Sequence, residues 1–96
     1  MSHYRLTPAA QTDLSSIWDF TQERWGVRQA ETYVNEIRAA IERVADNPER
    51  GRACGEIREG YRRYGIGSHL LFYVESSGGV DVIRILHQRM DPTRHL

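Results

Sequence analysis

Two runs of strand-forming residues, joined by a cluster of small residues, constrain this chain most. Residues 69–75 and 80–87 are rich in Val, Ile, Leu, Tyr and Phe, and Ser76-Ser77-Gly78-Gly79 lies between them. Because small residues with access to positive φ close tight antiparallel turns, the pattern predicts a β-hairpin. Residues 61–66 form a third candidate strand, and 57–58 and 4–6 are shorter candidates. We therefore expect a mainly antiparallel sheet.

Two amphipathic helices are predicted ahead of the hairpin. Thr7 can cap a helix that has Pro8 at its first position and ends near Gly26, which gives residues 8–25. Apolar residues recur at helical spacing from 30 to 45, until Asn47-Pro48 interrupts the pattern. Little more than Gly26 separates the helices, so they should form an antiparallel hairpin. The predicted fold is a single α+β domain over residues 1–96 with the order β-α-α-β-β-β, in which the sheet packs against the two helices.

The turn also predicts a strand register. A loop of two or four residues centred on Ser77-Gly78 pairs Glu75 with Val80, Tyr73 with Val82, Leu71 with Arg84 and Leu70 with Ile85. The face expected to cover the helices then carries Leu70, Phe72, Val74, Ile83 and Ile85. The opposite face carries His69, Leu71, Tyr73, Val82, Arg84 and Leu86. This second face is apolar enough to indicate a partner surface.

The charge composition favours protein partners over nucleic acid. All 13 basic residues are Arg, and 13 acidic residues balance them, so the formal net charge is zero. A protein that binds RNA or DNA through phosphates normally needs a net positive face, although a local Arg patch could still hold a phosphate. We expect no direct nucleic-acid binding.

The same composition indicates a cytoplasmic protein without a membrane anchor. No segment approaches the roughly 18 apolar residues that a membrane span requires, and the amino-terminal segment lacks the apolar run of a signal peptide. Cys54 is the only cysteine, which excludes an internal disulfide. The tryptophans Trp18 and Trp25 and the helical Tyr33 are expected in the core.

Several imidazole and guanidinium groups could form a functional site. His69, Arg84, His87 and Arg89 could contact phosphate or exchange protons, but surface residues paired with carboxylates produce the same pattern. His87 with Asp91 or His95 lacks a third ligand, so we expect no metal site. The tail, residues 88–96, either folds back on the domain or projects to a target.

The order and spacing of several short motifs resemble the ParE toxins of the RelE/ParE superfamily, which belong to bacterial type II toxin–antitoxin systems. The resemblance covers nearly the whole chain. The matching motifs are Tyr4-Arg-Leu-Thr-Pro-Ala-Ala, Asp13-Leu with Ile17-Trp18, Arg24-Trp-Gly-Val with Gln29-Ala30 and Tyr33, Asn47-Pro48 with Gly51-Arg52, Ile57-Arg-Glu-Gly-Tyr-Arg-Arg, Gly67-Ser-His with Phe72-Tyr73, and Arg84-Ile-Leu-His-Gln-Arg-Met-Asp.

The resemblance implies a non-enzymatic toxin that inhibits DNA gyrase, needs no cofactor, and is neutralised in a hetero-oligomer by a ParD-like antitoxin. The antitoxin should place an amphipathic helix across the helix hairpin and an extended segment toward the sheet. The residues expected to bind the target are Arg84, His87, Arg89, Met90, Asp91, His95 and Leu96. Those expected to bind the antitoxin are Tyr33, Arg62, Arg63 and Tyr73.

Two alternatives remain. A ribosome-dependent mRNA endoribonuclease that resembles RelE would use Arg62, His69 and Arg89, but the chain has no Lys, carries His69 where that branch usually has Arg, and has no Tyr beyond Tyr73. The second alternative is a non-toxic module that only binds its antitoxin.

Overall fold

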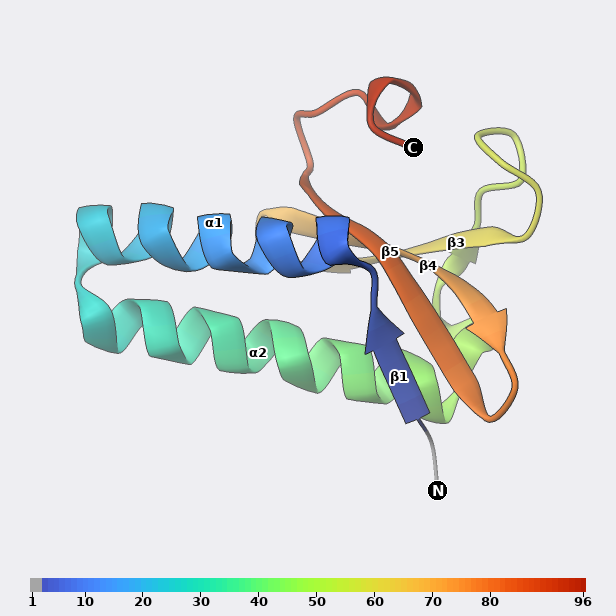
Figure 1. The fold of residues 1–96 in the computed structure, drawn as a ribbon, viewed down its shortest axis with the longest axis horizontal. Coiled ribbons are helices and arrows are strands. Elements are labelled where there is room, and N and C mark those ends of the chain that lie inside the picture. The colour runs from blue at the N-terminus through green and yellow to red at the C-terminus, as the bar shows by residue number, and fades with distance from the viewer. Residues whose placement is uncertain (1–2) are drawn as a thin grey trace.

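The computed structural model describes residues 3–96 and contains two helices and one five-stranded sheet (Figure 1). The sheet order is β1-β5-β4-β3-β2; β1 runs parallel to β5, and the other neighbours are antiparallel. The elements are β1 (His3–Leu6), α1 (Pro8–Trp25), α2 (Val27–Asp46), β2 (Arg52–Ala53), β3 (Tyr61–Ile66), β4 (His69–Ser76) and β5 (Gly79–His87), with single 3-10 turns at Pro48–Arg50 and Pro92–Arg94. The predicted α+β fold is confirmed, with β2 as an additional short strand.

Local capping rules explain where the helices begin and end. The Thr7 hydroxyl accepts a hydrogen bond from the Ala10 amide at 3.1 Å, which satisfies one of the free donors in the first turn of α1. Gly26 joins α1 to α2 with φ 93°, a conformation that favours glycine. Asn47 ends α2 and accepts from the Glu49 amide. The tip of the helix hairpin extends beyond the sheet in Figure 1.

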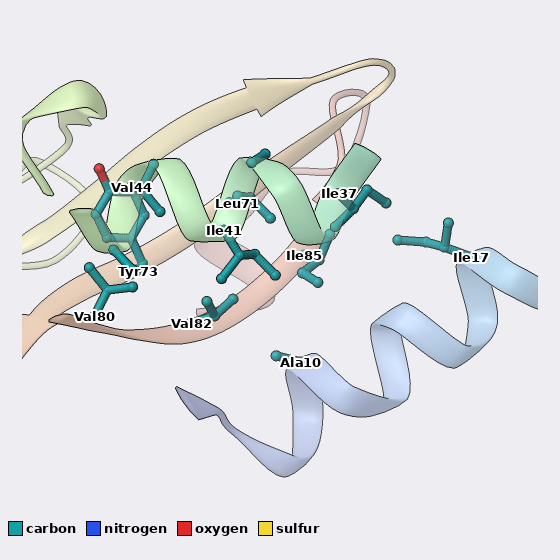
Figure 2. Close-up of a cluster of buried hydrophobic side chains, with 12 residues drawn as sticks. Ala10, Ile17, Ile37, Ile41, Val44, Leu71, Tyr73, Val80, Val82 and Ile85 are labelled. Carbon is teal, nitrogen blue, oxygen red and sulfur yellow. The ribbon is translucent and has the colours of Figure 1, made fainter. Parts of the chain in front are cut away.

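The main hydrophobic core lies between the helices and one face of the sheet (Figure 2). The α2 residues Ile37, Ile41 and Val44 are fully buried. They lie opposite the buried strand residues Leu71, Tyr73, Val80, Val82 and Ile85. Burial of apolar side chains at this interface supplies the main force that holds the two layers together.

The predicted register holds only for the half of the hairpin next to its turn. Glu75 pairs with Val80 and Tyr73 with Val82, but Phe72 then pairs with Arg84, which leaves Ile83 as an extra residue in β5. This β-bulge shifts the remaining pairs by one residue, so Leu71 faces Ile85 and Leu70 faces Leu86. The predicted pairs Leu71–Arg84 and Leu70–Ile85 are therefore wrong.

The predicted assignment of the two sheet faces is wrong for β4 and for Val82, while Ile85 packs with the helices and Leu86 lies on the far face as predicted. The residues that pack with the helices include Leu71, Tyr73 and Val82, which had been expected on the far face. The far face carries a second cluster in which Cys54, Phe72 and Leu86 are buried. The chain covers this cluster with partly buried Ile57, Tyr61, Leu70 and Leu96. The far face is therefore a second small core rather than an exposed apolar surface.

Two further expectations are corrected. Residues 57–58 form part of a turn, in which the Ile57 amide donates to the Cys54 carbonyl at 2.9 Å, and not a strand. Trp25, the last residue of α1, has 69% of its surface exposed. The helix hairpin extends beyond the sheet at this end, as Figure 1 shows. No helix within residues 3–96 has the length and hydrophobicity to cross a membrane.

Candidate functional site

Tyr33, His69 and His87 meet at the end of the sheet where β4 begins and β5 ends. The Tyr33 hydroxyl, on α2, lies 2.6 Å from His69 Nδ1 and accepts a hydrogen bond from the Ser68 amide at 3.1 Å. A Cβ on Gly67, which has φ 56°, would lie 2.6 Å from the Tyr33 ring. The tight turn between β3 and β4 therefore needs glycine in order to seat this tyrosine.

The two histidines are direct partners in the antiparallel register. His69 pairs with His87, and their rings meet edge to face with centroids 5.3 Å apart. Burial lowers the pKa of His69, the neighbouring His87 lowers it further, and Asp13 partly opposes both effects. His87 Nδ1 accepts a hydrogen bond from the Arg89 amide at 3.1 Å. The pair is thus held in place by separate partners on each side.

A pocket of about 310 Å³ opens between the histidines and α1. Its walls are mainly apolar, and two side chains at this site are well exposed: Phe20 at 60% and Met90 at 46%. The lining residues are Asp13, Ser16, Ile17, Phe20, Thr21, His69, Ile85, His87 and Met90. This histidine pocket brings together two of the predicted target-binding residues, His87 and Met90.

Arg84 serves the fold because its charge is neutralised within the chain. Its guanidinium binds the Asp13 carboxylate through Nε at 2.7 Å and Nη2 at 2.8 Å, and Asp13 also accepts from the Ile85 amide at 2.9 Å. The hydrogen bonds to Asp13 raise the pKa of Arg84. Arg84 Nη1 donates to the His95 carbonyl at 3.1 Å, so one ion pair joins α1, β5 and the tail.

The tail folds back on the domain. Asp91 caps its short 3-10 turn by accepting from the Thr93 hydroxyl and amide, and these bonds lower the pKa of the Asp91 carboxyl. Leu96 packs against the second core cluster. Met90, Asp91 and His95 remain exposed. Of the predicted target-binding set, Arg84 and Leu96 therefore support the fold, while Arg89 and the other members are accessible.

The predicted antitoxin-binding residues lie at three different places. Tyr73 is fully buried; its hydroxyl accepts from the Gly51 amide at 2.9 Å and donates to the Pro48 carbonyl at 2.6 Å. Arg62 donates to the Gly51 carbonyl at 2.8 Å. Arg63 pairs across the sheet with Phe72 of the second core, and Tyr33 lies in the histidine cluster. These four side chains do not form one continuous surface.

Of the residues of the ribonuclease alternative, His69 and Arg89 lie at the same end of the sheet, because the Arg89 amide donates to His87, the strand partner of His69, whereas Arg62 lies apart. Arg62 pairs with Tyr73, which lies four residues from His69 along β4, or about 13 Å at a rise of roughly 3.3 Å per residue. Arg89 lies beyond the end of β5. Residues 3–96 also contain no group of three His, Cys, Asp or Glu side chains placed to hold a metal ion.

Sequence reasoning missed Asp13 and Phe20. Asp13 is 71 residues from Arg84, so nothing in the local sequence distinguishes it from a solvated helical carboxylate. Phe20 follows Ile17 on α1 but lies toward solvent beside the pocket. Its helical position alone gives a weak signal, because an aromatic residue on an amphipathic helix is usually assigned to the core.

Comparisons with known proteins agree with this architecture. Residues 4–92 match the family described as "ParE toxin of type II toxin-antitoxin system, parDE". A protein of Mycobacterium tuberculosis named "Toxin ParE1" is 58% identical over 96 residues, which cover 99% of this chain and 98% of that protein. A protein of the same name from Caulobacter vibrioides is 44% identical over 96 residues, with 100% and 99% covered.

A solved structure shares the fold. The structure titled "Chromosomal ParDE TA system from P. aeruginosa" matches with a TM-score of 0.77 and 18% identity, covering 91% of this chain and 96% of that chain. The fold similarity agrees with the family match, which extends over almost all of the described residues. The chain therefore belongs to the ParE family of type II toxin–antitoxin toxins.

Proposed function

We propose that this toxin inhibits DNA gyrase without catalysing a reaction of its own, and that a ParD-like antitoxin neutralises it by direct binding. The observation that carries the proposal is the family match over residues 4–92, together with 58% identity to a full-length relative named as a ParE toxin. The neutral net charge supports a protein target, because binding to a phosphate backbone usually requires excess positive charge.

The arrangement of the cationic residues favours this proposal over ribonuclease activity. Arg62 and Arg84 are bonded to groups of the chain itself, the first to a backbone carbonyl and the second to a carboxylate. His69 is separated from Arg62 by about 13 Å along the sheet, at roughly 3.3 Å per residue. A phosphoryl-transfer site needs charged groups that converge on one phosphate, and of the ribonuclease set Arg62, His69 and Arg89, Arg62 lies at a distance from His69.

We place the antitoxin helix in the groove between α1 and α2. This hairpin groove has a volume of about 420 Å³ and combines apolar and charged side chains. An amphipathic helix could lay its apolar face into such a groove and pair its charges at the rim. The groove is lined by Leu6, Gln11, Leu14, Ser15, Trp18, Asp19, Val34 and Arg38. The target would instead contact the exposed side chains at the end of β5 and in the tail.

The test is a supercoiling assay with purified gyrase, relaxed plasmid and ATP, titrated with the antitoxin-free toxin. Loss of supercoiling, with accumulation of cleaved DNA and reversal by the antitoxin, is the expected outcome. Normal supercoiling by a gyrase from the same organism at excess toxin would reject the proposal. Cleavage of ribosome-bound mRNA would then identify the ribonuclease alternative, and unaffected growth on expression without antitoxin would identify the non-toxic module.

A further inference from the structure

Two arginines lie directly opposite each other at the edge of the sheet. Arg52 of β2 pairs with Arg63 of β3 in the antiparallel register, so both side chains leave the sheet on the same face. Direct cross-strand neighbours have Cβ atoms about 4.5–5.5 Å apart, and like charges in this position destabilise a sheet. Arg63 in turn pairs with Phe72, which places both side chains on the far face, beside the second core cluster.

The chain supplies no counter-charge to this arginine pair. Neither guanidinium makes an ion pair or a hydrogen bond with any of residues 3–96. Arg84 lies in the same row across the sheet and shows the contrast, because Asp13 binds it with two hydrogen bonds. The folded chain therefore keeps two unneutralised like charges side by side.

The segment that carries the pair is positively charged within a neutral chain. Residues 52–63 contain Arg52, Arg58, Arg62 and Arg63 against Glu56 and Glu59, whereas the 13 basic and 13 acidic residues of the whole chain cancel. Arg58 adds a third cation on the far face, since its guanidinium lies 6.0 Å from the ring centroid of Tyr61, which packs against the second core cluster. Arg62 instead donates to the Gly51 carbonyl. The excess positive charge is thus local to this edge.

We propose that Arg52 and Arg63 bind two carboxylates of an acidic, extended polypeptide segment on the far face of the sheet. A guanidinium can hold a carboxylate through two parallel N–H···O bonds, so each arginine can bind one acidic side chain. In an extended segment, acidic residues at positions i and i+2 project to the same side about 7 Å apart, which suits two neighbouring guanidinium groups. The bound carboxylates also offset the repulsion within the pair.

A polypeptide fits this surface better than a nucleic acid. A phosphate backbone carries charge along its whole length and needs a broad positive face, but this patch is short and has the exposed Glu56 and Glu59 beside it. The partly buried Ile57 and Tyr61 offer apolar contacts to the residues that flank the carboxylates. The arginine pair lies on the opposite face of the sheet from the helices and their groove, so the inference does not rest on the proposed function.

The test is an NMR titration of the full chain with the terminally capped peptide Ser-Glu-Val-Glu-Ser. The Nε–H resonances of Arg52 and Arg63 should shift together. The matched peptide with Gln in place of both Glu residues should bind at least about tenfold more weakly, because it loses the charge-assisted hydrogen bonds. Equal binding of the two peptides, or no shift at either arginine, would overturn the proposal. Tighter binding of a single strand of eight thymidylates would replace the polypeptide by a phosphate ligand.

One variant separates binding by the pair from a role in folding. Arg52→Glu turns the like-charged pair into an attractive cross-strand pair, so it should raise the melting temperature by about 1–4 °C and abolish the preference for the Glu peptide. Arg63→Gln should also remove the preference, whereas Arg28→Gln changes an exposed arginine on α2 and should preserve it. A folded Arg52→Glu protein that keeps the preference, or that melts at a lower temperature than the original chain, would contradict the assignment.

Discussion

Asp13 and Tyr33 show how single polar side chains join parts of the chain that are distant in sequence. Asp13 binds both the side chain of Arg84 and the backbone amide of Ile85. The last residue of β5 that pairs with β1 is Val82, so Asp13 supplies a hydrogen-bond partner on β5 after that pairing has ended. Tyr33 holds the β3–β4 turn through three contacts around one hydroxyl. Both residues contribute hydrogen bonds to groups that would otherwise be partly buried without partners.

Replacing Asp13 with Asn should destabilise the fold. The side chains of Asp13 and Arg84 are only 14% and 23% exposed, so the variant leaves a partly buried guanidinium without its counter-charge. We expect a loss of about 2–4 kcal/mol in the free energy of unfolding, measured by urea denaturation. The control is Arg94→Gln, which breaks a 3.9 Å pair between exposed side chains and should change stability by less than about 0.5 kcal/mol.

The lowered pKa of His69 predicts how stability changes with pH. The unfolded chain should take up a proton on this histidine near its ordinary pKa of about 6.5, before the folded protein does. The unfolded state then binds more protons, so stability falls as the pH drops from about 7 to 5. His69→Gln should reduce this slope in urea denaturation series. A steeper slope in His69→Gln would contradict the assignment.

At the scale of elements, Thr7 joins the start of α1 to the bulge in β5. Its hydroxyl accepts from the Ala10 amide and donates to the carbonyl of Ile83 at 2.7 Å, the extra residue of the bulge. The Thr7 amide also donates to the Val82 carbonyl at 3.0 Å. The helix cap and the change of register in the hairpin therefore depend on the same residue.

Thr7→Val should lose both hydroxyl interactions with little change in volume. We expect about 1.5–3 kcal/mol of destabilisation, the sum of a lost helix cap and a lost bond to a partly buried carbonyl. Thr7→Ser keeps the hydroxyl and should lose less than about 1 kcal/mol. Thermal unfolding monitored by circular dichroism compares the two. Equal losses for Val and Ser would show that the methyl group, and not the hydroxyl, matters here.

These contacts explain which elements could be predicted from sequence. Both helix boundaries follow from Thr7, Gly26 and Asn47, which act within a few residues, and both helices are confirmed. The hairpin turn and the pairs nearest to it are equally local. The bulge residue Ile83 is bound by Thr7, and Ile85, two residues later, is bound by Asp13. Both partners are more than 70 residues away in the sequence. Without those contacts, the register at the end of β5, and with it the pairing of His69 with His87, could not be assigned.

At the scale of the molecule, the two proposed partner surfaces are separate. The hairpin groove lies between α1 and α2, whereas the exposed tail residues and the histidine pocket lie beside α1 and the end of β5. The proposed function therefore predicts that substitutions can affect antitoxin binding and gyrase inhibition independently. Arg38, exposed at the groove, and Met90, exposed at the pocket, provide the matched pair.

Arg38→Glu should lower affinity for the antitoxin at least about tenfold, because it reverses a charge at the groove, and should leave inhibition of supercoiling unchanged. Met90→Ala removes an exposed side chain at the pocket and should instead raise the toxin concentration that inhibits supercoiling by half. Its affinity for the antitoxin should stay the same. Calorimetric titration and the supercoiling assay measure the two effects. Parallel losses in both assays for either variant would show that the partners share one surface.

The parallel pairing of β1 with β5 has a consequence for synthesis on the ribosome. β1 is the first strand along the described chain and β5 is the last, yet they are neighbours in the sheet (Figure 1). The helix hairpin, which depends on local contacts, can form while the chain is still emerging, but the sheet cannot be completed until β5 has left the exit tunnel. A nascent toxin thus exposes its hairpin groove, the proposed antitoxin site, before its C-terminal surface exists, so the proposed function predicts that an antitoxin already present can bind before the chain can act.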